Sequence, residues 1–371
     1  MRGLHQTIAR LTKLRRQEGH CSPANDGRLS EIGDFGANPG KLRGLLHIPD
    51  GLRPGAALVV VLHGCTQTAA LYDRGSGWSA LADRHGFAVL FPEQGRANNS
   101  NLCFNWFSPA DARRGKGEAL SIRQMIAAAV AAHGLDAGRV FITGLSAGGA
   151  MTVVMLATYP DVFAGGAVIA GLPFASANTL PEALERMRGS GGPSEQRLAA
   201  LAAAASGHGG PWPTLAVWHG TADHVVVPSN ADAIVAQWRG LTGVGAAPAR
   251  VESIDGYVRR VWDDATGRAV IEQYVVAGMG HGVPLDTRGE HWCGVAGPHM
   301  LEANVCSTSR IAQAWGLTVE RAARPAARPV TVIERARPES AMPPAAQPAS
   351  AARPAVTAVI EDALRATGLM R

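Results

Sequence analysis

Short apolar runs alternate with longer stretches of helical periodicity between residues 56 and 320. The apolar runs are rich in Val, Ile, Leu and Phe, which is typical of strands buried on both faces of a sheet. The predicted strands are Ala57–Leu62, Phe87–Phe91, Val140–Thr143, Ala167–Ala170, Leu215–Trp218 and Ile271–Val276. The predicted helices are Trp78–His85, Ala119–His133, Ala150–Tyr159, Ser229–Leu241 and Thr308–Trp315, with Gly86 and Gly134 as helix stops. This alternation predicts an α/β fold, in which helices cover both faces of a mostly parallel sheet.

Two segments depart from this alternation. Residues 180–206 are rich in Ala, Leu and Arg, with a Gly/Ser/Pro break at 189–193, and predict a small helical insertion around 174–212. That insertion is either a cap over a site or an ordinary excursion between core elements. Residues 251–276 predict an antiparallel pair of strands that turns near 264–267.

Composition divides the chain into four parts. Residues 1–27 form a basic tail without the continuous apolar stretch of a secretory signal. Residues 28–320 hold the predicted folded domain. Residues 321–355 are dominated by Ala, Pro and Arg and predict an extended, unfolded linker. Residues 356–371 predict one short helix.

Bulk composition excludes several classes of protein. The 371 residues, 46% hydrophobic and 18% charged, are typical of a globular protein that can bury a large core in one or two domains. No run of 18 apolar residues is present, so no membrane span is expected. Of the net charge of +5, residues 1–20 and 321–371 each carry +4, which leaves the region between them near −3. Because the basic residues belong to the tails, nucleic-acid binding by the folded domain is not expected.

Five cysteines leave at least one thiol unpaired. Cys293 and Cys306 flank a short segment that a disulfide could close, and Cys65 could pair with Cys103. The sequence does not decide between these pairings, and the default interpretation is a reduced cytosolic protein with five thiols.

The segment at residues 140–149 carries the clearest chemical signal. A β-branched run ends at Gly144, Ser146 lies between two glycines, and residues suited to a helix follow. This is the G-x-S-x-G pattern in its strand, turn and helix context, which predicts a nucleophilic serine. The glycines are needed because Ser146 is held in a strained backbone with other chain segments close by. The alternative is a Gly/Ser-rich turn without chemistry.

A serine nucleophile needs a base and an acid, which in this arrangement follow later in the chain. Asp223 lies in a loop just after the predicted strand 215–218 and is the candidate acid, whereas Asp161 and Asp232 lie beside or within helices. His281 lies among glycines after the strand 271–276 and is the candidate base. His291 and His299 lack a strand directly before them, and His219 and His224 are expected to shape the loop of the acid.

The third requirement is a pair of donors for the oxyanion that forms during acyl transfer. One is the backbone N–H of Ala147, directly after the nucleophile. The other is expected in the loop after an early strand, where Gly64 permits a turn and the N–H of Cys65 is the candidate. A plain strand-to-loop turn is the alternative for His63-Gly64. No cofactor is required by this chemistry, and no metal site is predicted, because the Cys and His spacings match no metal-ligand pattern.

At this point the chain resembles the poly(3-hydroxybutyrate) depolymerase-like esterases, a group of α/β-hydrolases. The likeness spans residues 28–317 and rests on Leu62-His63-Gly64-Cys65-Thr66-Gln67, Phe91-Pro92-Glu93-Gln94, Cys103-Phe104-Asn105-Trp106-Phe107, Gly144–Met151, Ala170-Gly171-Leu172-Pro173 and Gly280-His281. The resemblance implies an α/β-hydrolase fold and a triad of Ser146, Asp223 and His281. It implies an oxyanion N–H from Cys65, and Asn105 and Trp106 in the substrate cleft, where we also expect His63.

The resemblance implies hydrolysis of hydroxy-acid esters, with feruloyl and acetylxylan esterases as relatives. The substrate is expected to be a small or oligomeric ester. Extracellular polymer depolymerases carry a signal peptide and a polymer-binding module. Solid polymer is a less expected substrate here, because no signal is visible and the residues after the linker are too few for such a module. The family is largely secreted and this N-terminus lacks a signal, so extracellular and cytoplasmic locations both remain open. The remaining alternatives are a feruloyl or acetylxylan esterase and a non-catalytic binding protein on a hydrolase fold. The oligomeric state is not predicted.

Overall fold

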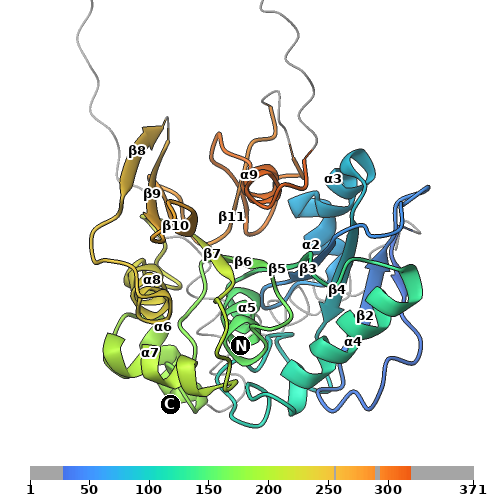
Figure 1. The fold of residues 1–371 in the computed structure, drawn as a ribbon, viewed down its shortest axis with the longest axis horizontal. Helices are drawn as coiled ribbons and strands as arrows, with labels where there is room; N and C mark the ends of the chain where they lie inside the picture. Colours follow the sequence, from blue (N-terminus) through green and yellow to red (C-terminus); the bar gives the residue numbers. More distant parts are fainter. Residues whose placement is uncertain (1–27, 255, 289–292, 319–371) are drawn as a thin grey trace, which may run out of the picture. The chain divides into compact units, whose positions relative to one another are not determined.

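The computed structural model describes residues 28–254, 256–288 and 293–318, and its centre is a ten-stranded sheet (Figure 1). The strand order is β1-β2-β4-β3-β5-β6-β7-β10-β9-β8. The strands are β1 (Ser30–Glu31), β2 (Arg43–His47), β3 (Leu58–Leu62), β4 (Ala88–Glu93), β5 (Val140–Leu145), β6 (Gly165–Ile169), β7 (Thr214–Gly220), β8 (Arg250–Ile254), β9 (Tyr257–Asp263) and β10 (Ala269–Val276). The six strands from β4 to β10 in this order run parallel, and antiparallel strands flank them on both edges. The predicted, mostly parallel sheet is therefore confirmed.

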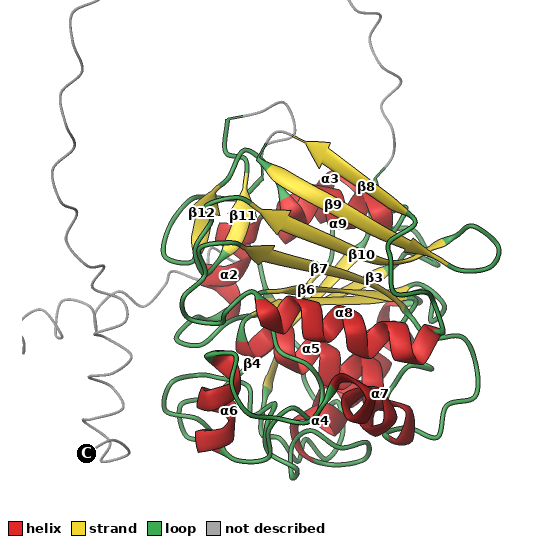
Figure 2. Ribbon diagram, turned by 90° about the vertical axis from the view of Figure 1, so that its left-hand side faces the viewer, coloured by secondary structure: helices red, strands yellow, loops and turns green. Residues whose placement is uncertain are grey.

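Helices cover both faces of the sheet, as the sequence predicts (Figures 1 and 2). One face carries α4 (Gly117–His133), α5 (Ala147–Thr158), α6 (Leu180–Met187), α7 (Glu195–Ala204) and α8 (Ser229–Thr242). The other carries α2 (Ala69–Ser76), α3 (Trp78–His85) and α9 (Ser307–Ala314), together with the small parallel pair β11 (Val283–Leu285) and β12 (Met300–Glu302).

Two apolar cores result from the alternation of side chains along each strand. In β3, Leu58, Val60 and Leu62 belong to the core under α4, α5 and α8. Val59 and Val61, between them, belong to the core on the α2, α3 and α9 face. A strand that is apolar at every position is therefore buried on both sides, which explains why these runs could be recognised in the sequence.

The predicted helix ends are also present. Gly86 and Gly134 have φ of 75° and 60°, and their N–H groups donate to the carbonyls of Ala82 and Val130. A left-handed residue at this position closes the last turn of a helix, and glycine adopts it without strain.

The segment around 174–212 is helical, but its longer helix is not a cap over the site. Gln237 of α8 donates to the carbonyls of Phe174 and Leu198, so α7 packs beside α8 in the helix layer (Figure 2). Of the two predicted alternatives, α7 therefore fits the ordinary excursion between core elements. The predicted antiparallel pair is β9–β10, where the N–H of Asp264 donates to the carbonyl of Arg268, and β8 adds a further strand.

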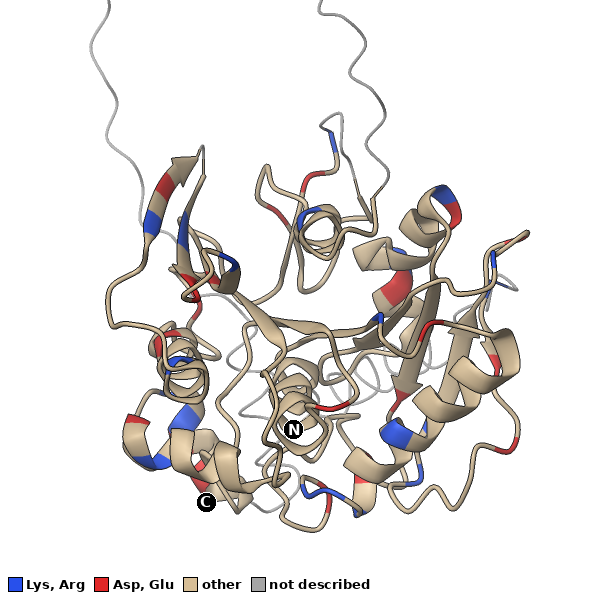
Figure 3. Ribbon diagram, in the orientation of Figure 1, with Lys and Arg blue, Asp and Glu red and all other residues tan. Residues whose placement is uncertain are grey.

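The basic tail at 1–27, the linker at 321–355 and the helix at 356–371 lie outside the described residues. None of the helices among the described residues has the length and apolar character needed to cross a bilayer. In the view of Figure 3, acidic and basic residues are interspersed along the helices and the β8 edge. Arg259 there pairs with Glu252 at 2.9 Å and with Glu272 at 2.8 Å.

Candidate active site

Ser146 lies in the turn between β5 and α5. Its φ is 56° and its ψ is −117°, a positive-φ conformation that costs a non-glycine residue about 1–3 kcal/mol. The predicted strained backbone is therefore confirmed. The side chain makes no capping hydrogen bond to α5 and is partly exposed, so its hydroxyl is available for chemistry.

The glycines on either side of Ser146 are required by close backbone approaches. A Cβ on Gly148 would collide with the carbonyl oxygen of Leu62 at the end of β3, and one on Gly144 would collide with the carbonyl of Gly148. The first turn of α5 therefore lies directly against the end of β3. This contact places Ser146 beside the loop that follows β3.

The loops after β7 and β10 are joined by backbone hydrogen bonds. The N–H of Thr221 donates to the carbonyl of Val276, and the N–H of Ala222 donates to that of Met279. A Cβ on Gly220 would collide with the Met279 carbonyl. Because β7 and β10 are parallel neighbours, this junction brings residues 58 positions apart in the sequence into one place.

Asp223 and His281 form a hydrogen-bonded pair at this junction. The Nδ1 of His281 lies 2.7 Å from Oδ2 of Asp223, and the side chain of Asp223 is buried. The other carboxylate oxygen, Oδ1, accepts the N–H groups of Val225 and Val226, each at 2.9 Å. Burial raises the pKa of Asp223, but hydrogen bonds with His219 and His281 outweigh it, so this pKa lies well below its usual range.

The competing side chains have other partners. Asp161 pairs with Arg114 on the surface, and Asp232 accepts from the side chain of Gln273 at 2.8 Å. His219 approaches Asp223 at 3.4 Å, but its Nε2 is bonded to the carbonyl of Val226 at 2.7 Å. His219 therefore shapes the loop of the acid, as predicted.

Two of the other histidines considered are described and lie outside this pair. His299 contacts the backbone carbonyl of His281 at 3.1 Å, and His224 is exposed, whereas His291 lies outside the described residues. In the part of the chain that the structure describes, the Ser146 hydroxyl makes no hydrogen bond to His281. Ser146 and the pair nonetheless follow parallel strands of one sheet, at its carboxyl edge.

The loop after β3 holds the second predicted oxyanion donor. Among the described residues, neither the N–H of Cys65 nor that of Ala147 donates to a protein group. A turn begins at Gly64, whose carbonyl accepts the N–H of Gln67 at 3.3 Å, and the positive φ in this turn falls on Thr66, at 64°. The turn also closes through the side chain of Gln67, which accepts the N–H of Gly64 at 2.9 Å.

Two disulfides resolve the question that the sequence left open. Cys65 pairs with Cys103 and Cys293 pairs with Cys306, with Cα–Cα distances of 4.3 and 6.0 Å. The first bridge ties the loop after β3, which carries the predicted oxyanion donor, to the segment after β4. Cys21 lies outside the described residues.

The predicted cleft residues have internal roles in the structure. His63 is buried; its Nε2 accepts the N–H of Gln94, and its Nδ1 therefore donates to the carbonyl of Gly64. Burial lowers the pKa of His63, which favours this neutral form. Trp106 is buried with its ring edge-on to Phe107, and Asn105 bonds to the buried Glu118. Contact of His63, Asn105 and Trp106 with substrate stays a prediction.

Glu118 is the residue that sequence reasoning missed. It lies in the first turn of α4, is fully buried, and has its pKa raised to about 8 by burial. A single Glu at the start of a helix is a common pattern, because carboxylates favour that position. The local sequence therefore carried no signal of its burial.

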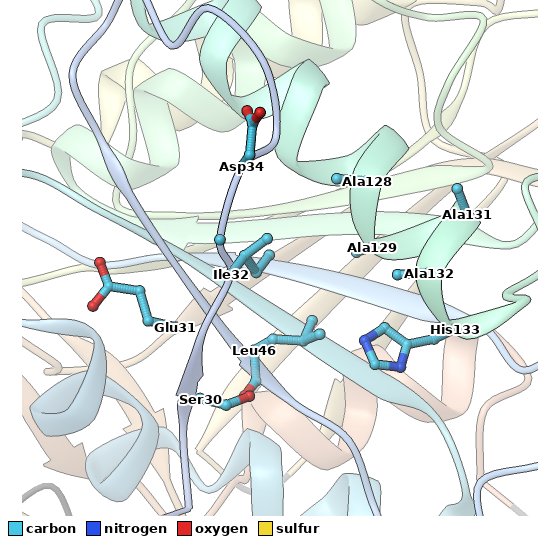
Figure 4. Close-up of a pocket in the computed structure, with 11 residues that line it drawn as sticks. Ser30, Glu31, Ile32, Asp34, Leu46, Ala128, Ala129, Ala131, Ala132 and His133 are labelled. Carbon is cyan, nitrogen blue, oxygen red and sulfur yellow. The ribbon is translucent and has the colours of Figure 1, made fainter.

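A cavity of about 650 Å³ lies away from these residues, between the β1 edge and the end of α4 (Figure 4). Ile32 and Leu46 face a row of alanines there, and none of the predicted site residues lines it. Within residues 28–254, 256–288 and 293–318, no group of three His, Cys, Asp or Glu side chains is placed to hold a metal ion.

The sheet, the strained serine turn and the aspartate–histidine pair define the chain as an α/β-hydrolase. The chain belongs to the esterase PHB depolymerase family, whose model matches residues 45–255. It is 45% identical to poly(3-hydroxyalkanoate) depolymerase C of Paucimonas lemoignei, over 78% of this chain and 70% of the relative. It is also 31% identical to feruloyl esterase B of Talaromyces stipitatus, over 72% and 76% of the two chains.

Among solved structures, an acetyl xylan esterase from Aspergillus awamori is similar, with a TM-score of 0.67 and 26% identity. The match covers 78% of this chain and 99% of that one. Together with the family assignment, these relatives identify the chain as a carboxylic ester hydrolase.

Proposed function

We propose that the chain hydrolyses esters through a Ser146–His281–Asp223 triad and an acyl-enzyme. The observation that carries this proposal is the 2.7 Å hydrogen bond between His281 and the buried Asp223, at the sheet edge where Ser146 directly follows β5. Asp223 accepts from Nδ1, which leaves Nε2 of His281 as the proton acceptor. The depressed pKa of Asp223 keeps it ionised and able to stabilise an imidazolium.

The reaction then proceeds in two balanced halves. His281 takes the proton of Ser146 while Oγ attacks the ester carbonyl, and the same proton passes to the alcohol as the C–O bond breaks. Water next attacks the acyl-enzyme with His281 as base, releasing the acid and restoring the serine. The N–H groups of Ala147 and Cys65, which have no protein acceptor among the described residues, bind the oxyanion in both halves.

We propose an ester of a 3-hydroxyalkanoate, as an oligomer or polymer, as the substrate. The support is the 45% identity to a poly(3-hydroxyalkanoate) depolymerase over most of this chain. A feruloyl or acetylxylan ester is the second candidate. The acetyl xylan esterase whose whole chain superposes on this one favours it.

The mechanism is tested with Ser146→Ala on p-nitrophenyl butyrate. We expect turnover to fall by about 10⁴-fold or more, and mass spectrometry to find an acyl adduct on Ser146 in the parent only. Turnover near the parent level in the folded variant would eliminate the mechanism. A fluorophosphonate probe gives an independent check, because it should label Ser146 in the parent.

The substrate is tested with a panel of 3-hydroxybutyrate oligomers, methyl ferulate and acetylxylan. We expect the highest kcat/KM on the oligomers. A preference for either of the others would transfer the assignment to the second candidate, and equal rates on all three would indicate an unspecialised esterase.

A further inference from the structure

Glu118 is a buried carboxyl group that the proposed mechanism does not use. It accepts four hydrogen bonds from described residues. Oε1 accepts from the side chains of Gln94 at 2.6 Å, Asn105 at 2.7 Å and Asn98 at 3.3 Å, and Oε2 accepts the backbone N–H of Asn105 at 2.9 Å. Leaving these donors unpaired in a buried site would be costly, so the carboxyl and the donors hold one another in place.

All four donors belong to one segment of the chain, residues 94–105, which follows β4. The same segment makes internal hydrogen bonds that depend on this arrangement. The side chain of Gln94 also donates to the carbonyl of Cys103 at 3.0 Å. The side-chain oxygen of Asn99 accepts the N–H of Cys103 at 3.2 Å, and its NH₂ group donates to the side chain of Asn105 at 2.9 Å. Glu118 is therefore the centre around which residues 94–105 are folded.

Residues 94–105 are in turn bonded to the loop that carries the N–H of Cys65. The disulfide joins Cys103 to Cys65, and the N–H of Thr66 donates to the carbonyl of Asn101 at 2.7 Å. The N–H of Gln94 donates to His63 at 3.1 Å, and His63 bonds to the carbonyl of Gly64 at 2.8 Å. Three separate connections thus run from the Glu118 shell to residues 63–66.

We propose that Glu118 is a positioning residue for the oxyanion hole, which it acts on through residues 94–105 and the Cys65–Cys103 bridge. The inference rests on the proposed function, because it needs Cys65 to be an oxyanion donor. Donors that bind an oxyanion must lie within a few tenths of an ångström of their working position, since catalysis falls steeply with misplacement. A loop without secondary structure positions its N–H groups this accurately only if supporting residues hold the loop through hydrogen bonds.

The position of Glu118 on α4 suits this role. Its backbone is fixed in the first turn of a 17-residue helix that packs on the sheet, so the carboxyl is presented from a rigid element. The positive end of the helix dipole partly offsets the cost of burying the carboxyl there. An apolar side chain could fill the space but could not accept four N–H groups.

The experiment uses Glu118→Gln in the full chain, with Asp73→Asn as the matched control. Asp73 is also a buried carboxyl, which accepts the N–H of Ser79 at 2.8 Å and has no bond to residues 63–66. We expect Glu118→Gln to lower kcat on p-nitrophenyl butyrate by about 10- to 100-fold with KM within about 3-fold. We expect Asp73→Asn to leave kcat within about 2-fold, whatever it does to stability.

A second measurement separates oxyanion binding from general damage to the fold. The rate of reaction of Ser146 with a p-nitrophenyl phosphonate, whose tetrahedral adduct places an oxygen in the hole, should fall in parallel with kcat. A folded Glu118→Gln variant with parent kcat, or with equal changes in both variants, overturns the inference. If Glu118→Gln does not fold, Glu118→Asp and Asn98→Ala decide it: a several-fold lower kcat at unchanged KM supports the inference, and parent kcat in both overturns it.

These outcomes are distinct from failure of the proposed function. If Ser146→Ala retains turnover, the triad itself is wrong. If Ser146→Ala is inactive while the Glu118 variants keep the parent kcat, the triad stands and only the role of Glu118 is wrong.

Discussion

Ser146 lies between two regions that each contain a buried acidic side chain, and the pKa values of the two acids are shifted in opposite directions. On the β7–β10 side, Asp223 meets the imidazoles of His219 and His281, and its pKa is lowered. On the β3–β4 side, Glu118 meets only neutral amide donors, and burial raises its pKa to about 8. Both side chains are buried, yet their pKa values shift in opposite directions. Hydrogen bonds with two imidazoles outweigh desolvation at Asp223, whereas the amide donors do not outweigh it at Glu118.

The comparison also separates two kinds of work at an active site. In the proposed mechanism, the Asp223 side carries the groups that move a proton. In the proposed role of Glu118, its side carries hydrogen bonds that hold backbone N–H groups in position. Activity should therefore respond to the exchange of single atoms on the Asp223 side. On the Glu118 side it should respond to changes that displace the loop after β3.

The largest expected effect is on the Asp223 side. Asp223→Asn preserves the shape of the site but favours the wrong tautomer of His281, so kcat should fall by about 10⁴-fold. The measurement is steady-state hydrolysis of p-nitrophenyl butyrate. Asp161→Asn is the control, because Asp161 is an exposed partner of Arg114, and it should keep parent activity. An Asp223→Asn enzyme with more than a tenth of the parent kcat would contradict the assignment of the acid.

The next effect compares the two disulfides. Cys65–Cys103 spans 38 positions and Cys293–Cys306 spans 13, so loop entropy predicts losses of about 4 and about 3 kcal/mol in the free energy of unfolding. Replacing both cysteines of one bridge by serine and measuring denaturant unfolding tests these values. Only the first replacement should also lower kcat by about 10-fold or more, because only it loosens the loop that carries the proposed oxyanion donor Cys65. Equal loss of kcat in both would remove the distinction between the regions.

A smaller effect is expected at Gly148, where the first turn of α5 lies against the end of β3. Ala normally stabilises a helix relative to Gly by about 1 kcal/mol, but here its Cβ would collide with the Leu62 carbonyl. Gly148→Ala should therefore destabilise the protein by about 1–3 kcal/mol and displace the loop after β3. Gly245→Ala is the control, since nothing lies within 4 Å of a Cβ there. A neutral or stabilising Gly148→Ala would show that the backbones are not in close contact.

The last effect is a slope, at most about 1.4 kcal/mol per pH unit for each group, in the pH dependence of the free energy of unfolding. The folded pKa of Asp223 is lowered, so its stabilisation is present above its unfolded pKa and is lost as pH falls through the folded value. The folded pKa of Glu118 is raised by burial, with a smaller contribution from Asp111. Its unfolded form therefore ionises first, and stability falls as pH rises from about 4.5 towards 8.

Unfolding by urea between pH 3 and 9 would separate the two groups. Asp223→Asn should flatten the loss of stability in acid, and Glu118→Gln should flatten the decline between about 4.5 and 8. If both variants kept the parent slope in both ranges, the opposite pKa shifts of the two acids would be contradicted.

The local sequence determined the parallel strands, the helix ends and the strained turn at Ser146. Each of these depends on neighbours within a few positions: β-branched runs such as Val140–Thr143, a glycine after the last helical turn, and glycines flanking a serine. Asp223 and His281 could also be selected, because a residue directly after a late strand must lie at the carboxyl edge of the sheet.

Only the tertiary structure decided which of these residues meet. The disulfide of Cys65 with Cys103 and the packing of α7 beside α8 join positions that are far apart in the chain. The local sequence around Glu118, which accepts four hydrogen bonds, does not differ from that of a surface helix. Burial determines the charge of Glu118 and the neutrality of His63, and burial is a property of packing. The chemistry could therefore be predicted from local patterns, whereas the groups that hold it in place could not.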